Sequence, residues 1–280
     1  MKLTILGTGT PQPNPQRSGP AQVVSIGDDN ILIDAGAGTM HRFVQAGYTT
    51  APLKAIALTH LHSDHVTGIL DVLWAGWIQR RWKVPPTIYG PPGTQHFIDH
   101  LIQAMSYDIK VRSGEVLDPM NLVPFVVEIE DGWKVRGKDW QLSAFRVDHF
   151  PVDEAFGFRI DQGSSSVVIS GDTRLSENLI AHSKDTDLLV HEVYWTKGLR
   201  DIAAAAKDAE ERARFELVGS YHTGSQEVGK VAERSGAKHL VLSHIIRSRG
   251  DPADFETDIR PDYRGKLTVA EDLMTFEVGG

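Results

Sequence analysis

Residues 59–65, which read THLHSDH, constrain this chain more than any other segment, because they place three imidazoles and one carboxylate within a single short loop. The segment directly follows the apolar run at 55–58, which is typical of a buried strand. One tetrahedral ion could not take all four groups from so short a loop and keep an open position. The segment therefore predicts a site for two metal ions. A solvated histidine cluster is the alternative, but it would not require the apolar strand.

Composition narrows the kind of metal site that the chain can build. The chain has 280 residues, 41% of them apolar, which is enough for a sizeable core. It contains no cysteine, so any metal must be held by histidine and carboxylate side chains. A reducing cytoplasm fits this composition, and we expect the protein there. The chain opens on a strand-like run rather than a signal peptide, and no apolar run approaches the length of a membrane span.

The net charge of −8 bears on the kind of partner. An acidic chain repels a polyanion at long range, although two divalent cations would make the pocket locally positive. Extended nucleic-acid binding is therefore disfavoured, and a small-molecule ester is the expected substrate.

Short apolar strands alternate with helical patterns along the whole chain, with no internal repeat and no low-complexity linker. This alternation predicts one α/β domain over residues 1–280, with two sheets packed together. The expected strands lie near residues 3–6, 22–26, 31–33, 54–58, 141–147, 155–160, 166–170, 188–190, 239–242 and 267–278.

Two helical segments stand out. The first follows the histidine-rich loop and carries an apolar stripe that is predicted to pack in the core. The alternative is that its end, from Trp74 to Trp82, forms a homodimer contact. The stripe consists of Leu70, Leu73, Trp74, Trp77 and Ile78. The second segment, from Leu199 to Val218, is predicted to be one amphipathic helix at the surface that also forms a pocket wall.

Four further candidate ligands lie beyond predicted strand ends, where loops position chemistry on a rigid scaffold. They are His149, Asp172, His191 and His244. Each alone is typical of an ordinary loop residue or a hydrogen-bonded structural histidine. Together with the histidine-rich loop they form a pattern.

This pattern resembles the metallo-β-lactamase superfamily, in particular its ribonuclease Z and arylsulfatase-like branch, over nearly the whole chain. The matching motifs are LGTGTP at 6–11, IDAG at 33–36, the loop at 59–65, GDT at 171–173, HE at 191–192 and LSH at 242–244, together with His149 and His222. The resemblance implies a four-layer αβ/βα sandwich with two mixed sheets and the metals at the sheet edge.

The resemblance also implies a ligand set for two zinc ions. His60, His62 and His149 would hold one ion, and Asp64, His65 and His244 the other. Asp172 would bridge both, with a hydroxide completing the bridge as the nucleophile. Asp64 could also orient that hydroxide. Manganese or iron could replace one zinc, because these ligands serve all three metals.

Three residues remain for catalysis outside the ligand set. In the resembling enzymes a histidine-glutamate pair and a later histidine lie near the scissile group, and His191, Glu192 and His222 occupy those places. His222 would donate a proton to the leaving group, and Glu192 would orient it. For His191 a buried structural role is the alternative.

Two departures separate the chain from the ribonucleases. Of their lysine-arginine-asparagine signature in the early loop only Arg17 matches, and the segment 150–171, where they usually insert a tRNA-clamping arm, is short. We therefore expect a dinuclear zinc hydrolase acting on a small phosphodiester or sulfate ester. A β-lactamase or lactonase is one alternative, and a non-catalytic metal-binding or partner-binding module is another.

Overall fold

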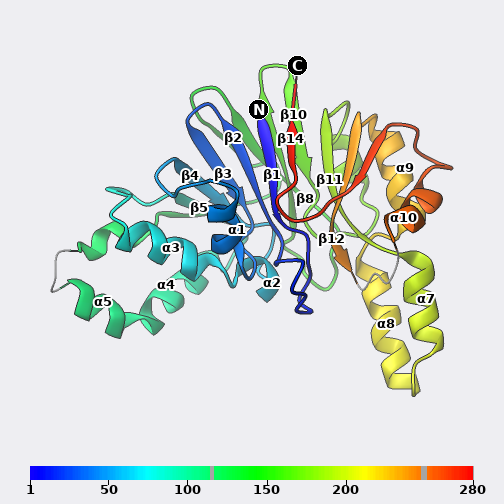
Figure 1. Cartoon of the computed structure of the whole chain (residues 1–280), viewed down its shortest axis with the longest axis horizontal. Helices are drawn as coiled ribbons and strands as arrows, with labels where there is room; N and C mark the ends of the chain where they lie inside the picture. Colours follow the sequence, from blue (N-terminus) through cyan, green and yellow to red (C-terminus); the bar gives the residue numbers. More distant parts are fainter. Residues whose placement is uncertain (114–116, 247–250, 280) are drawn as a thin grey trace.

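The computed structural model describes residues 1–113, 117–246 and 251–279. Over these residues, two seven-stranded sheets lie face to face, and helices cover their outer faces (Figure 1). Each sheet contains both parallel and antiparallel pairs. The predicted α/β four-layer sandwich is therefore confirmed.

The first sheet is built mainly from the N-terminal half of the chain. Its strand order is β14-β1-β2-β3-β4-β5-β6. These strands are β1 Lys2–Gly7, β2 Ala21–Ile26, β3 Asp29–Ile33, β4 Leu53–Ala57, β5 Thr87–Gly90, β6 Val126–Glu128 and β14 Thr275–Glu277. A two-residue turn joins β2 to β3, and Gly27 supplies the positive φ of 57° that such a turn needs.

The second sheet is built from the C-terminal half. Its strand order is β13-β12-β11-β10-β9-β8-β7. These strands are β7 Lys134–Arg136, β8 Gln141–Arg146, β9 Phe156–Gln162, β10 Ser165–Ile169, β11 Leu188–Tyr194, β12 His239–Ile246 and β13 Lys266–Val269. β10, β11, β12 and β13 run parallel, so their carboxyl ends meet at one edge.

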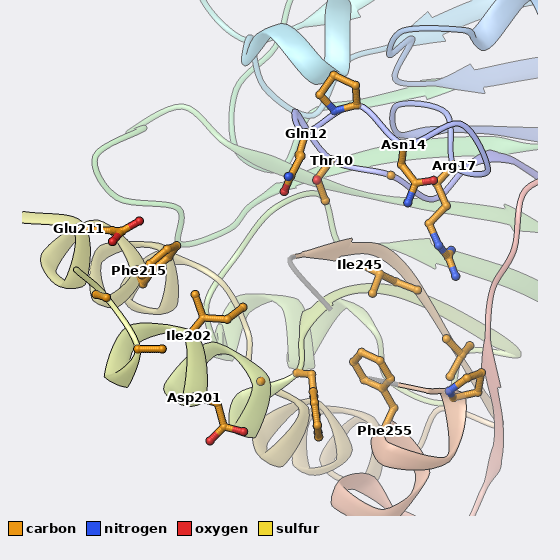
Figure 2. Close-up of a pocket in the computed structure, with 18 of the residues that line it drawn as sticks. Thr10, Gln12, Asn14, Arg17, Asp201, Ile202, Glu211, Phe215, Ile245 and Phe255 are labelled. Carbon is orange, nitrogen blue, oxygen red and sulfur yellow. The ribbon is translucent and has the colours of Figure 1, made fainter. Parts of the chain in front are cut away.

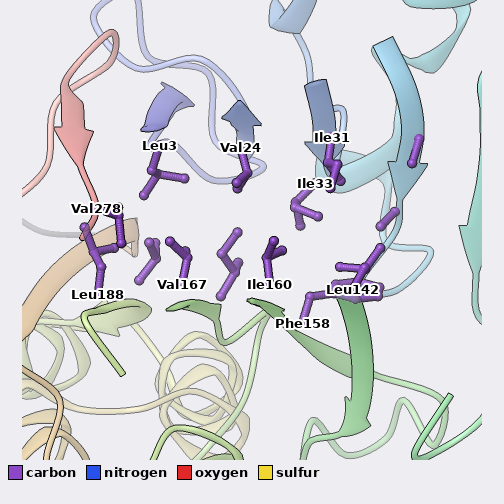
Figure 3. Close-up of a cluster of buried hydrophobic side chains, with 14 of the residues drawn as sticks. Leu3, Val24, Ile31, Ile33, Leu142, Phe158, Ile160, Val167, Leu188 and Val278 are labelled. Carbon is purple, nitrogen blue, oxygen red and sulfur yellow. The ribbon is translucent and has the colours of Figure 1, made fainter. Parts of the chain in front are cut away.

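The inner faces of the two sheets share one apolar core. Figure 3 shows Leu3, Val24 and Ile33 of the first sheet opposite Ile160 and Val167 of the second. All of these side chains are fully buried. Every second residue of each strand points to this face. Many of these residues are β-branched, because such side chains pack well on a pleated, buried surface.

Helices form the two outer layers. The first sheet is covered by α1 Thr39–Gln45, α3 Ile69–Ile78 and α4 Thr94–Ala104, and the second by α6 Glu177–His182, α9 Ser225–Ser235 and α10 Pro252–Ile259. The short helix α2 Ser63–Val66 follows β4, and α5 Ser106–Ser113 and the single turn η1 Pro119–Asn121 follow α4. Among the described residues, no helix is long and apolar enough to cross a membrane.

The tryptophans of the first predicted helix belong to the core. Trp74, Trp77 and Trp82 are buried, and each indole N–H donates to an oxygen of the same chain. Ile78, at the end of the predicted stripe, is instead 39% exposed. A homodimer remains a prediction, but these buried indoles are not its contact surface.

Two predicted elements are wrong. The single strand expected over 267–278 is two strands in different sheets, because β13 pairs with β12 whereas β14 pairs with β1. Between them Leu273 has a φ of 72°, a left-handed conformation that a strand cannot contain.

The single helix expected over 199–218 is a helical hairpin of α7 Thr196–Ala204 and α8 Ala209–Tyr221. The side chain of Asp208 starts α8 anew by accepting the Glu211 backbone N–H at 2.8 Å.

Candidate metal centre

The histidine-rich loop lies where β4 reaches the sheet edge, and close backbone packing holds it there. The backbone N–H of Ala35 donates to the carbonyl of His65 at 2.7 Å. A Cβ atom added to Gly36 would lie 2.2 Å from the carbonyl oxygen of Asp64. Only glycine permits this approach, so the IDAG segment supports the ligand loop from below.

The seven predicted ligands converge in two groups. Within each group the candidate ligand atoms lie within 4.8 Å of one another. The first group is His60, His62, His149 and Asp172, and the second is Asp64, His65 and His244. All are buried except His62, which is exposed. This grouping agrees with the two ligand sets inferred from the family resemblance, whereas their roles as metal ligands remain a proposal.

A bulge in β12 delivers His244. On the neighbouring strand Glu192 pairs with Ser243 and Val193 pairs with Ile245, so His244 is an extra residue in the ladder. Its φ of 44° is unusual for a residue other than glycine. Bulges re-aim side chains at functional edges, and here the imidazole reaches Asp64 Oδ2 at 3.2 Å.

Asp172 is the centre of the cluster. Its Oδ2 atom lies 3.4 Å from His65 Nε2, 3.5 Å from His244 Nε2, 3.8 Å from His60 Nε2 and 3.9 Å from His149 Nε2. One carboxylate oxygen therefore faces four imidazoles drawn from both groups. A shared anion between two cations has this arrangement.

Unpaired polar atoms test whether the residues fit metal ions. In the described structure, buried side-chain atoms of four cluster residues have no hydrogen-bond partner: His60 Nε2, His65 Nε2, Asp172 Oδ1 and His244 Nδ1. Leaving such atoms unsatisfied is costly, and native proteins seldom do so. Nitrogen and oxygen ligands at this density suit divalent zinc, manganese or iron, so the donor set fits.

The electrostatics favour a cation as well. Burial, together with the neighbouring His65, lowers the pKa of His60 well below its ordinary value. Burial likewise lowers the pKa values of His62 and His149, which keeps these imidazoles neutral and able to ligate. Burial would raise the pKa of Asp172, but the surrounding imidazoles, led by His244, outweigh it and hold this pKa well below its usual range. The carboxylate is thus ionised.

Asp34 supports the centre, although in the sequence it is recognisable only as part of the IDAG motif. Its Oδ2 accepts from the Thr59 hydroxyl at 2.9 Å and lies 2.7 Å from His65 Nδ1, and its Oδ1 accepts the Thr59 N–H at 2.8 Å. A carboxylate on Nδ1 fixes the tautomer that leaves Nε2 free for a metal. The signal was an acidic residue directly after a buried strand.

Glu192 and His222 form a pair beside the cluster. His222 Nδ1 lies 2.9 Å from Glu192 Oε1, which also accepts the backbone N–H groups of Thr173 and Thr223. The ligand atoms of His222, Asp172 and His244 lie within 4.8 Å of one another. The expected orienting contact between Glu192 and His222 is therefore present. That His222 acts without coordinating a metal ion stays a prediction.

His191 lies on the other side of β11. Successive strand residues face opposite sides, and Glu192 faces the cluster. Leu189 and Val193, which point to the same face of β11 as His191, pack under the outer helices. The fully buried imidazole of His191 contacts the Glu192 carbonyl through Nδ1 at 2.7 Å. The geometry does not bring His191 to the site, and the alternative of a buried structural residue describes its surroundings.

The helical hairpin reaches the centre through its last residue. α8 ends at Tyr221, whose carbonyl lies 3.0 Å from His149 Nδ1, and His222 follows directly. The hairpin also lines a cavity of about 890 Å³ together with the N-terminal loop. Figure 2 shows Ile202 and Phe215 of the hairpin on one side and Arg17 on the other. The predicted segment therefore lines a cavity, although it is two helices. None of the candidate ligands lines this cavity, so its role as a wall of the substrate pocket stays a prediction.

A second cavity of about 650 Å³ is also lined by the N-terminal loop. Its lining includes Arg17 from that loop and Ser63, Asp64 and Thr67 from the histidine-rich segment. Of the candidate ligands, Asp64 is the one that lines this cavity in the part of the chain that the structure describes.

Comparisons with known proteins agree with this geometry. The family model described as "Anti-Pycsar protein Apyc1" matches residues 1–208. A ribonuclease Z from Mycobacterium bovis is 31% identical, and the alignment covers 99% of this chain and 98% of the relative.

Solved structures show the same fold. The metallo-β-lactamase fold protein YhfI from Bacillus subtilis has a TM-score of 0.74 at 21% identity, with 99% of each chain covered. Human tRNase Z, short form, has a TM-score of 0.73 at 24% identity, with 100% of each chain covered. The chain is therefore a metal-dependent hydrolase of the metallo-β-lactamase superfamily and belongs to its ribonuclease Z branch, with the Apyc1 family model matching most of its length.

Proposed function

We propose that the protein holds two zinc ions and hydrolyses a small phosphodiester, with a sulfate ester as a related substrate. The observation that carries this proposal is the position of Asp172 Oδ2 between the imidazoles of both ligand groups. A single closed structural zinc site would need only four ligands and no shared carboxylate. Two zinc ions held by the two ligand groups would lower the pKa of a bound water and polarise the ester oxygen.

The chain's own residues complete the reaction. Water would add to phosphorus as the bond between phosphorus and the leaving oxygen breaks, and the proton that the water loses would pass through Nε2 of His222 to the leaving oxygen. Burial lowers the pKa of His222, so the resting ring is neutral and can take up this proton before it gives it away. Glu192 holds Nδ1 of the same ring, so Nε2 faces the cluster. Asp64, which contacts His244, is placed to orient the attacking water.

Two features support a small substrate. Residues 156–169 form the β9–β10 hairpin within the second sheet, so most of the segment 150–171 is used by the fold itself. The net charge of −8 also offers little attraction for a long polyanion. Precursor tRNA is the second candidate, because the ribonuclease Z relative matches over nearly its whole length.

Metal analysis and hydrolysis assays test the proposal. Zinc-loaded protein should contain two ions per chain and cleave bis(4-nitrophenyl) phosphate or 4-nitrophenyl sulfate. Asp172→Ala should lose activity and at least one ion. Asp148→Asn is the matched control, since Asp148 is a loop carboxylate paired with Arg174 outside the cluster.

Two results would count against the proposal. One ion held unchanged in Asp172→Ala would defeat the bridging role. Accurate and efficient cleavage of precursor tRNA by the wild type, with no turnover of small esters, would favour the second candidate.

A further inference from the structure

The bulge that carries His244 lies beyond the part of β12 that pairs with β13. The described ladder between these two strands ends at Leu242, whose carbonyl accepts the Ala270 N–H at 2.9 Å. β12 itself continues to Ile246, and His244, with its φ of 44°, falls in this last stretch. A residue other than glycine keeps such a conformation only where its surroundings hold it. The end of β12 therefore needs a partner other than β13.

The N-terminal loop supplies this partner through Thr8. The Ile245 N–H, one residue after the candidate ligand, donates to the Thr8 carbonyl at 2.9 Å. Thr8 is fully buried, and Figure 2 shows the N-terminal loop beside Ile245. On its other side His244 follows Ser243, which is paired with Glu192 on β11. Because the backbone is fixed on both sides of His244, the direction of its imidazole depends on the contact with Thr8.

Asp272 fixes Thr8 from the segment that crosses between the two sheets. Figure 1 shows this C-terminal segment running from the second sheet to β14, beside β1. Asp272 Oδ1 accepts the backbone N–H of Thr8 at 3.0 Å and the Thr8 hydroxyl at 2.8 Å. Asp272 Oδ2 accepts the Ser18 N–H at 2.7 Å and lies 3.1 Å from Arg42 Nε. Thr8 and Ser18 lie near the two ends of the loop between β1 and β2, so one buried carboxylate fixes this loop as a whole.

We propose that Asp272 is a positioning residue for the metal ligand His244. The carboxylate holds the Thr8 N–H, and the Thr8 carbonyl holds the Ile245 N–H next to the ligand. The imidazole of His244 in turn reaches Asp64 Oδ2 at 3.2 Å. This inference rests on the proposed function, because it takes His244 as a ligand. It adds that the crossover segment determines how tightly the second ligand group binds its ion.

Zinc titration of Asp272→Asn tests this path. Both carboxylate oxygens accept hydrogen bonds, whereas an amide offers one oxygen and one NH₂ group, so in either orientation the NH₂ group faces a donor. The change is nearly isosteric and leaves every candidate ligand in place. Competition with a chromogenic chelator should show the ion of the second ligand group binding about tenfold more weakly, while the ion of the first group keeps its wild-type affinity.

Asp187→Asn is the matched control. Asp187 also accepts a backbone N–H, that of Ser166 at 2.8 Å, and pairs with Lys238 at 2.7 Å. It directly precedes β11, at the opposite end of this strand from the bulge. Asp187→Asn should lower stability in urea and leave both zinc affinities unchanged. An equal loss of zinc affinity in Asp187→Asn, or an equal weakening of both ions in Asp272→Asn, would overturn the positioning role.

Two ligand variants show which ion responds. In a His244→Ala background, Asp272→Asn should cause no further loss of zinc affinity, because the side chain that it positions is gone. In a His62→Ala background, which truncates the first ligand group, Asp272→Asn should keep its effect of about tenfold. A loss of the same size in the His244→Ala background would contradict the path through His244.

Amide exchange of the metal-free protein supplies a readout that needs neither zinc nor turnover. In Asp272→Asn the Ile245 N–H should exchange about tenfold faster relative to the Leu240 N–H of the same strand, because its acceptor is no longer fixed. An unchanged ratio between these two amides would refute the path. If the wild type binds fewer than two zinc ions, the proposed function fails, and the exchange ratio still decides whether Asp272 holds the bulge.

Discussion

Replacing Asp34 by asparagine should weaken metal binding without disturbing the backbone. Asp34 has a φ of 56°, in the left-handed region that both aspartate and asparagine tolerate better than most residues. The substitution is nearly isosteric, so it changes hydrogen bonding and charge rather than packing. Any effect on the centre must then pass through the contacts of this carboxylate with Thr59 and His65.

The contacts set the size of the effect. The carboxylate faces three donors: the Thr59 N–H, the Thr59 hydroxyl and His65 Nδ1. An amide offers one oxygen and one NH₂ group, so in either orientation the NH₂ group faces a donor. Losing one charge-assisted hydrogen bond in a buried place costs about 1.5–3 kcal/mol. If His65 moves its proton to Nε2 to relieve this conflict, that nitrogen can no longer ligate.

We expect zinc affinity to fall by about 10- to 100-fold in Asp34→Asn, measured by competition with a chromogenic chelator. Asp29→Asn is the control, because Asp29 lies on the same strand, β3, and accepts the Trp140 indole N–H away from the cluster. It should reduce stability and leave zinc affinity unchanged. An unchanged zinc affinity in Asp34→Asn, or an equal loss in Asp29→Asn, would refute the orienting role.

Three further outcomes follow from the site. His222→Ala should keep both ions and lower the turnover of esters with poor leaving groups by roughly 10²–10⁴-fold, whereas esters that release nitrophenolate should lose little turnover. Glu192→Gln should show part of the same defect. Loss of an ion in His222→Ala would instead make His222 a metal ligand. Burial lowers the pKa of His191 from 6.5 to about 4, so the unfolded chain takes up this proton first and stability is lost as the pH falls from about 6.5 to 4. His191→Gln should therefore lose about 3 kcal/mol less unfolding free energy than the wild type over that range in urea titrations of metal-free protein, and an unchanged acid dependence would contradict this. Burial opposes the charge on His65, but Asp172 and Asp34 outweigh it and raise the pKa of His65 well above 6.5, so zinc binding should release a proton near neutral pH, detected as a buffer-dependent calorimetric enthalpy that Asp34→Asn reduces.

The sequence predicted the architecture well where periodicity and sheet packing agree. The strands preceding the cluster, such as those near 54–58 and 166–170, were recognisable because buried strands that end in polar loops leave a clear pattern. The run 267–278 misled because its apolar residues continue across a turn, and nothing in residue type marks the positive φ of Leu273. The second helix of the hairpin was hidden by the strong helix propensity of residues 203–206, which outweighed the N-cap signal of Asp208.

The cluster residues were predictable for a different reason. They could be identified from the sequence because histidine and carboxylate are the usual zinc ligands and because their motifs follow the order of the family that the chain resembles. The supporting contacts could not be predicted in the same way. The role of Asp34 depends on a contact between the ends of two strands, and the placement of His191 depends on which face of β11 it occupies. Arg17 was visible as the one match to the early-loop signature, but the cavities that it lines depend on the folded loop.

The bulge at His244 separates catalysis from folding in an unusual way. Because this residue is extra to the ladder between β11 and β12, a one-residue deletion there would restore regular pairing and cost the sheet little. The same deletion would remove one candidate metal ligand from the group that contains Asp64 and His65. Loss of a single codon could thus give a folded but inactive protein. A relative of this fold that lacks the bulge is therefore expected to bind the substrate without hydrolysing it.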